Sequence, residues 1–153
     1  FPVEAVSIMS KIAETAEKSI DYKSKFYATE FKIKNSSDAV SHATCAMAMD
    51  INAKAIVACT ISGMTARMVS RFRSPVDIIG LTTDVHAYRK LALSWGVWPA
   101  LTDEYTSIDI LFYFAKQIAK KSGLVKKGDT IVITGGTPNG KSGNSNLINV
   151  ETI

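Results

Sequence analysis

A turn rich in hydroxyl groups is the clearest candidate for chemistry in this sequence. Thr60-Ile61-Ser62-Gly63-Met64-Thr65 follows a short apolar run and precedes a helical pattern, with Arg67 about one turn further on. Free backbone N–H groups at the start of a helix favour an anion, and a nearby guanidinium adds charge. Thr60, Ser62, Gly63, Met64, Thr65 and Arg67 therefore predict a phosphate pocket. An ordinary helix-capping turn is the alternative.

A second motif lies near the end of the chain. Residues 135–142 match the pattern G-x-x-x-x-G-K-S of a nucleotide-binding loop. That loop requires a helix directly after it, whereas residues 143–153 predict a short strand, so we reject nucleotide hydrolysis. We expect instead that the loop closes over an anion, with Gly140 giving mobility and Lys141 a point charge.

The remaining reactive side chains are few. Cys45 lies in an Ala/Met-rich helical pattern and is predicted to pack, whereas Cys59 ends an apolar run beside the candidate pocket. An enzyme using the Cys59 thiol is therefore a further possibility. His42 and His86 are too far apart to form a zinc site with these cysteines, so no metal site is expected. Two cysteines make no disulfide framework, which favours a reducing, cytoplasmic location.

Composition excludes several classes of protein. The 153 residues are 46% hydrophobic and 21% charged, which is typical of a single globular domain spanning residues 1–153. No apolar run reaches the roughly 18–20 residues of a membrane span. The net charge of +4 is scattered and lacks interleaved aromatic residues, so neither a membrane nor a nucleic acid is expected as a partner.

The first third of the chain predicts two helices. Apolar residues recur at helical spacing over residues 3–20, and residues 21–36 predict an irregular connector. A second helix begins near residue 37, with Ser36, Ser37 and Asp38 as candidate caps. Its stripe of small and apolar residues is predicted to pack on a sheet: Ala39, Val40, Ala43, Ala46 and Met47.

From residue 54 onward strands and helices alternate. Strands are predicted at 55–59, 77–82, 97–101 and 130–134, and the intervening helices start near Gly63, Asp84 and Ser107. This alternation predicts an α/β fold with a mainly parallel sheet covered on both faces. A last strand at 146–150 follows a short loop and should be antiparallel. Trp95 and Trp98 are expected in the core.

Ordered motifs along the whole chain resemble one family. They are Phe1-Pro2-Val3-Glu4-Ala5-Val6, residues 60–67, residues 69–75, Leu81-Thr82-Thr83, residues 95–99, Lys127-Gly128-Asp129, residues 134–140 and Asn146-Leu147. Each motif is weak alone, but their order is similar to that of the C-terminal domain of pyruvate kinase, and the longer glycine-rich loop resembles the bacterial type.

The resemblance implies a fold and a role. The fold would be a three-layer α/β/α sandwich with a five-stranded mixed sheet. The role would be that of a regulatory domain that binds a phosphorylated allosteric effector and contributes contacts to a homo-oligomer. The parent enzyme would transfer phosphate from phosphoenolpyruvate to ADP with magnesium and potassium, using a barrel domain that would precede Phe1. This chain would then hold no catalytic residue and no cofactor, and alone it would be inactive as a kinase.

The resemblance also bears on the effector. The family's effector phosphate matches the turn at residues 60–65. Positions that match the family's partners for a second phosphate hold Ile61, Glu104 and Leu111, which disfavours fructose 1,6-bisphosphate. A sugar monophosphate, a nucleoside monophosphate or an inorganic anion fits better. A free-standing small-anion-binding protein of the same fold is the alternative function, and the length of the parent reading frame would separate the two.

Overall fold

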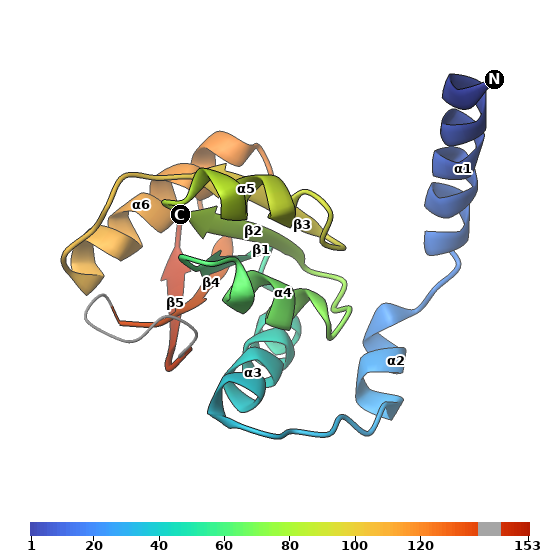
Figure 1. Ribbon diagram of the computed structural model, residues 1–153. Coiled ribbons are helices and arrows are strands. Elements are labelled where there is room, and N and C mark those ends of the chain that lie inside the picture. Colours follow the sequence, from blue (N-terminus) through green and yellow to red (C-terminus); the bar gives the residue numbers. More distant parts are fainter. Residues whose placement is uncertain (138–144) are drawn as a thin grey trace.

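A five-stranded mixed sheet forms the centre of the molecule. The computed structural model describes residues 1–137 and 145–153. The strand order is β3-β2-β1-β4-β5, with four parallel strands and an antiparallel β5 at one edge. The strands are β1 (Ala55–Cys59), β2 (Asp77–Thr82), β3 (Val97–Leu101), β4 (Thr130–Gly135) and β5 (Leu147–Thr152). The predicted fold class and the antiparallel last strand are confirmed (Figure 1).

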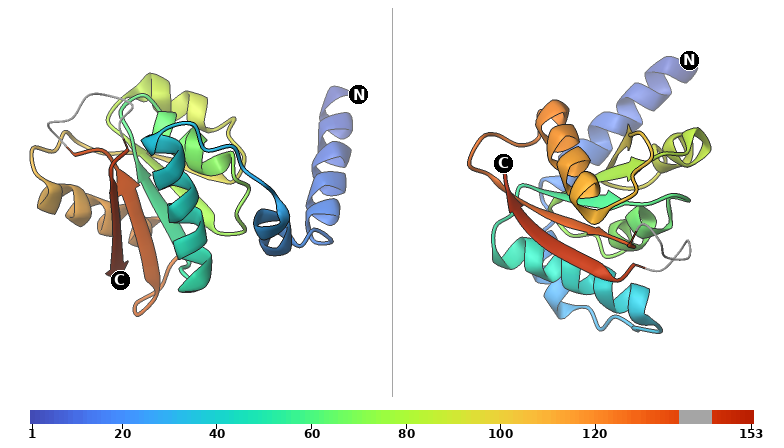
Figure 2. Two further views of the ribbon diagram at one scale, coloured as in Figure 1. Left: turned by 90° about the horizontal axis from the view of Figure 1, so that it is seen from below. Right: turned by 90° about the vertical axis from the view of Figure 1, so that its left-hand side faces the viewer.

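Helices cover both faces of the sheet. The face with α3 (Ser36–Asp50) also carries α4 (Met64–Ser70) and α5 (Val85–Leu91), whereas α6 (Ile108–Ser122) covers the opposite face (Figure 2). This arrangement follows from right-handed crossovers. The chain runs outward from β1 to β3, then returns through α6 to β4 on the other side of β1. The change of direction places a topological switch point between β1 and β4, where ligands of such sheets bind.

The core divides into two layers because strand side chains alternate. Every residue of β1 is buried. Ile56 and Ala58 pack in the layer under α3 and α4, and Val57 and Cys59 pack in the layer under α6. A strand buried on both faces has a continuous apolar sequence, which is why the prediction for 55–59 is confirmed.

The N-terminal region differs from the prediction. Residues 22–28 form the short helix α2 (Tyr22–Ala28) where an irregular connector was expected. The Asp21 side chain caps α2 by accepting a hydrogen bond of 2.9 Å from the Ser24 amide, and Phe26 is its only buried residue. A helix with one buried residue leaves no periodic apolar pattern, so its sequence looks irregular.

Helix α3 buries a face that was not expected. Asn35, rather than Ser36, Ser37 or Asp38, is the N-cap. The buried residues are Asp38, Ser41, Thr44, Cys45, Ala48 and Met49, whereas Ala39 and Ala43 are exposed. Buried hydroxyl groups are tolerated where they bond to the helix backbone, as the Thr44 hydroxyl does to the Val40 carbonyl at 2.8 Å.

Helix α1 (Pro2–Glu17) stands apart from the sandwich (Figure 1). It has no buried residue. The Trp95 indole N–H of the sandwich donates a hydrogen bond of 3.3 Å to the carboxylate of Glu17 at the end of α1. Trp98, predicted in the core, is 56% exposed because β3 is an edge strand, and Trp95 is only half-buried. Within the described residues, no helix is long and apolar enough to cross a bilayer.

Candidate functional site

The turn after β1 lies beside the switch point of the sheet. The Thr60 amide donates to the Leu81 carbonyl at 2.9 Å, which extends the pairing of β1 and β2 by one residue. The Thr82 hydroxyl then donates to the Ile61 carbonyl at 3.0 Å. The end of β2 therefore fixes the backbone of the turn from one side.

Gly63 makes the sharp change from strand to helix possible. It is the N-cap of α4 and has a φ of +81°, in the left-handed region that favours glycine. A Cβ added there would also lie 3.4 Å from two side-chain atoms of Leu91. The backbone therefore enters α4 at an angle that other residues adopt only with strain.

The residues expected to bind an anion lie in the turn before α4 and on α4 itself. The amides at the start of a helix have no intrahelical partner, and among the described residues the Met64 amide has no other acceptor. Ser62, Met64 and Arg67 are exposed, whereas Thr60 and Thr65 are buried. One Arg67 nitrogen lies 3.9 Å from the Met64 sulfur, so the guanidinium lies at the N-terminal end of the helix.

Thr65 has a partner that the sequence did not predict. Its hydroxyl lies 2.9 Å from that of Ser145, in a buried hydrogen bond. The Ser145 amide also donates to the Ser37 hydroxyl at 3.4 Å, at the beginning of α3. Ser145 therefore joins the starts of two helices, and one of the hydroxyls expected to bind a ligand already has a protein partner.

The glycine-rich loop begins and ends beside the same turn. At Gly135 an added Cβ would lie 3.0 Å from the Cβ and the carbonyl oxygen of Cys59, so β4 approaches β1 closely here. The Asn146 amide donates to the Gly135 carbonyl at 3.0 Å, and the Asn146 side chain accepts from the Thr137 amide at 3.3 Å. Gly140 and Lys141 lie outside the described residues.

The two cysteines are poor nucleophiles. Cys59 is 2% exposed, and burial raises its pKa to about 12. Burial likewise raises the pKa of Cys45 to about 12. Both thiols are therefore neutral near pH 7, which argues against an enzyme that uses Cys59.

The positions considered for a second phosphate carry no cation. Ile61 in the turn is 55% exposed, Glu104 is an exposed carboxylate, and Leu111 is fully buried on α6. None of these three positions therefore supplies a cation for a second phosphate.

Comparison of the sequence with models of protein families shows to which family the chain belongs. The model of the family described as "Pyruvate kinase, alpha/beta domain" matches residues 38–151, which include β1 to β4 and all but the last residue of β5. The chain belongs to this pyruvate kinase family. The resemblance in the sequence is thereby confirmed.

Individual relatives agree with the family match. The chain is 41% identical to a pyruvate kinase of Clostridium acetobutylicum, 40% to pyruvate kinase 2 of Synechocystis and 35% to a pyruvate kinase of Lactobacillus delbrueckii. Each match covers all of this chain but only 33%, 25% and 26% of the respective relative. The chain thus spans a quarter to a third of the length of these relatives.

Proposed function

We propose that this pyruvate kinase alpha/beta domain binds a phosphorylated small molecule at the turn of residues 60–65. The observation that carries the proposal is the position of this turn at the switch point, between the ends of β1 and β2 and the Ser145 junction. Amide donors, the Ser62 hydroxyl and the Arg67 guanidinium together suit one phosphate group.

The charges around the turn favour a small set of effectors. Arg67 is in the last turn of the seven-residue helix α4, and its guanidinium lies 3.9 Å from the sulfur of Met64 at the start of that helix. The position that matches the partner of a second phosphate holds the carboxylate Glu104 in place of a cation. A sugar monophosphate, a nucleoside monophosphate or inorganic phosphate therefore fits better than fructose 1,6-bisphosphate. Binding would regulate the rest of the enzyme through contacts between subunits of a homo-oligomer.

The proposed parent reaction is that of the named relatives. In this proposal the parent transfers phosphate from phosphoenolpyruvate to ADP in the cytoplasm, with magnesium and potassium held in a barrel domain. The present chain contributes no catalytic group to that reaction. A coupled assay of residues 1–153, with both metals added, should therefore give no turnover, and sustained turnover by material free of host enzyme would contradict the proposal.

Thermal unfolding with added ligands tests the anion site. Phosphate, ribose 5-phosphate, AMP and fructose 1,6-bisphosphate are compared, since a ligand at ~100 times its Kd stabilises a protein by about 2.7 kcal/mol. The double variant Ser62→Ala/Arg67→Gln should lose the shift in Tm. Ser7→Ala/Arg89→Gln makes the same chemical changes on α1 and α5, and it should retain the shift. An equal shift in both variants would place the site elsewhere.

A further inference from the structure

A cavity lies at the opposite end of α4 from the turn. It measures about 320 Å³, is open to solvent on one side, and is lined by α2 and the residues after it, by the segment after α4 and by the loop before β3. This volume lies within the usual range of pockets for small ligands, roughly 300–1,000 Å³. Helix α4 has seven residues and is therefore about 10 Å long, which separates the cavity from the turn at residues 60–65.

The lining of this cavity combines two kinds of side chain. Five of its nine lining residues are aromatic, which suits a flat apolar body. Three more are the cations Lys25, Arg71 and Arg73, and no carboxylate is among the nine. Such a lining matches a ligand that has a planar ring and a negative charge.

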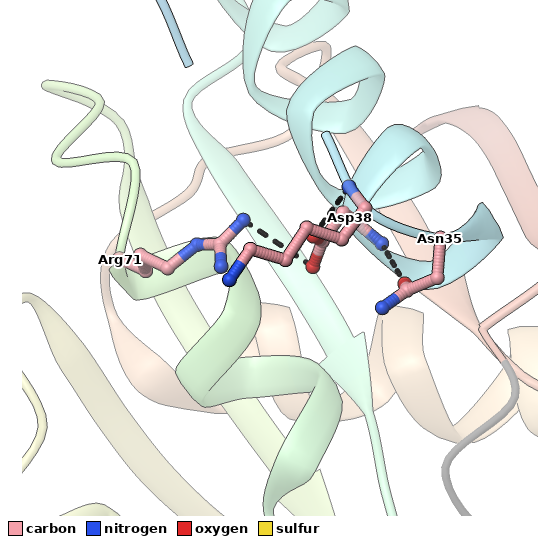
Figure 3. A network of polar contacts seen from close by, with 4 residues as sticks. Asn35, Asp38 and Arg71 are labelled. Carbon is pink, nitrogen blue, oxygen red and sulfur yellow. Dashed lines mark hydrogen bonds and ion pairs between the residues drawn. The ribbon is translucent and has the colours of Figure 1, made fainter. Parts of the chain in front are cut away.

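Several contacts hold the walls of this cavity in place. The Ser70 hydroxyl donates to the Trp95 carbonyl at 2.6 Å, and the Tyr22 ring lies 5.2 Å from the Trp95 ring. Arg71 is held by the buried carboxylate of Asp38 at 3.3 Å (Figure 3). The positions of Trp95, Tyr22 and Arg71 are therefore set before a ligand binds, which lowers the entropy lost on binding.

The other two cations remain without an acidic partner. In residues 1–137 and 145–153, neither Lys25 nor Arg73 forms an ion pair. Arg73 has a φ of +53°, a backbone conformation that is unfavourable for arginine, and its guanidinium lies 4.8 Å from the centre of the Trp95 ring. Arginines that follow a helix can also interact favourably with the negative end of its dipole. That role explains neither the position of Lys25 on α2 nor the left-handed backbone conformation of Arg73.

We propose that this cavity binds a small planar-ring phosphate, with the ring among the aromatic side chains and the phosphate between Lys25 and Arg73. The site is separate from the turn at residues 60–65 and goes beyond the function proposed above. The probe for this chemistry is phenyl phosphate. Inorganic phosphate tests the phosphate group alone, and phenol tests the ring alone.

Calorimetric titration of the whole protein that carries this chain tests the proposal. Phenyl phosphate should bind at least ten-fold more tightly than inorganic phosphate or phenol. Lys25→Gln and Arg73→Gln should each raise its Kd roughly five-fold or more, as expected for the loss of a charge-assisted hydrogen bond. Lys23→Gln, an equal charge change on the same helix outside the lining, should leave the Kd unchanged.

Two further variants keep the test decisive. Arg73→Gly removes the guanidinium and relieves the left-handed backbone, so it should weaken binding without loss of folding. Ser62→Ala/Arg67→Gln, which tests the turn, should leave phenyl phosphate binding intact. The proposal is overturned if phenyl phosphate fails to bind at millimolar concentration, binds no better than inorganic phosphate, or binds the Lys25 and Arg73 variants as well as the wild type.

Discussion

The carboxylate of Asp38 on α3 pairs with the guanidinium of Arg71 after α4, 3.3 Å away, although the Asp38 side chain is only 3% exposed (Figure 3). The second carboxylate oxygen accepts the Lys34 amide at 3.0 Å. The Asp38 amide itself donates to the Asn35 side chain at 2.8 Å. One buried acidic residue therefore joins the segment before α3 to the end of α4.

Replacing Asp38 with alanine should destabilise the protein by about 1–3 kcal/mol, because the Lys34 amide and Arg71 would lose a charged acceptor. Thermal or urea unfolding measures the change. Asp103→Ala removes an exposed loop carboxylate and should change stability by less than about 0.5 kcal/mol. Equal losses in the two variants would contradict this role of Asp38.

The sequence was most informative where burial and periodicity agree. Strand β1 and the helix caps Asp84 and Ser107 follow local rules, so their positions could be predicted. Helix α2 could not, since it depends on one buried residue, Phe26, whose ring stacks on His42 of α3 at 4.8 Å. Contacts between distant segments leave no local pattern.

The same limit applies to the sites. The turn at residues 60–65 is a continuous segment, so its donors could be recognised together. Ser145 could not be paired with Thr65 because 80 residues separate them. The cavity beside Trp95 is likewise assembled from α2, the end of α4 and a later loop.

Two buried serines should respond differently to alanine. The Ser41 hydroxyl is buried and has no hydrogen-bond partner in the described part of the chain, whereas the Ser70 hydroxyl donates to the Trp95 carbonyl at 2.6 Å. Ser41→Ala should therefore leave stability unchanged or raise it slightly, and Ser70→Ala should lower it by about 1–2 kcal/mol. Unfolding in urea compares them. A larger loss in Ser41→Ala would mean that its hydroxyl has a partner, such as a buried water.

The turn after α3 offers a stabilising substitution. Asn52 is exposed and has a φ of +54°, and the following Ala53 amide donates to the Ala48 carbonyl at 2.8 Å. Such left-handed positions after a helix favour glycine. Asn52→Gly should therefore preserve or raise stability by a few tenths of a kcal/mol, whereas Asn52→Ala should lower it by about 1 kcal/mol. The order of the three Tm values checks this prediction, and the reverse order would refute it.

An ion pair between α6 and β5 should make stability depend on pH. Lys116 donates to Glu151 at 3.0 Å, and this hydrogen bond holds the pKa of Glu151 below its ordinary value of 4.5. A lowered pKa in the folded state stabilises the protein above the ordinary pKa, and this contribution is lost as pH falls through the lowered value. Both side chains are partly exposed, so the effect should be only a few tenths of a kcal/mol.

Unfolding in urea from pH 7 to pH 3 measures this effect. Glu151→Gln should be less stable than the wild type at pH 7, and the two should converge at the acidic end. In a Lys116→Met background, the difference in unfolding free energy between Glu151 and Glu151→Gln should be smaller. A constant difference at every pH would exclude the titration of Glu151 as its cause.

The outer edge of β5 is the surface expected to join two copies of the chain. Within the described residues, strand β5 pairs with β4 alone, so its other edge presents backbone groups that a second strand can bind. Val150 on this strand is 45% exposed, whereas Leu147 and Ile148 pack against the two core layers. A two-fold pairing of β5 with its copy would be the simplest closed arrangement.

Sedimentation across micromolar concentrations tests this pairing in the chain of 16.6 kDa. Val150→Lys should weaken the dimer at least ten-fold, because two lysines would face each other near the two-fold axis while the core stays intact. Ile33→Lys also adds a lysine at a site that is 45% exposed, but it lies before α3 and should leave association unchanged. A monomer at every concentration, or equal weakening by both variants, would exclude β5 as the interface.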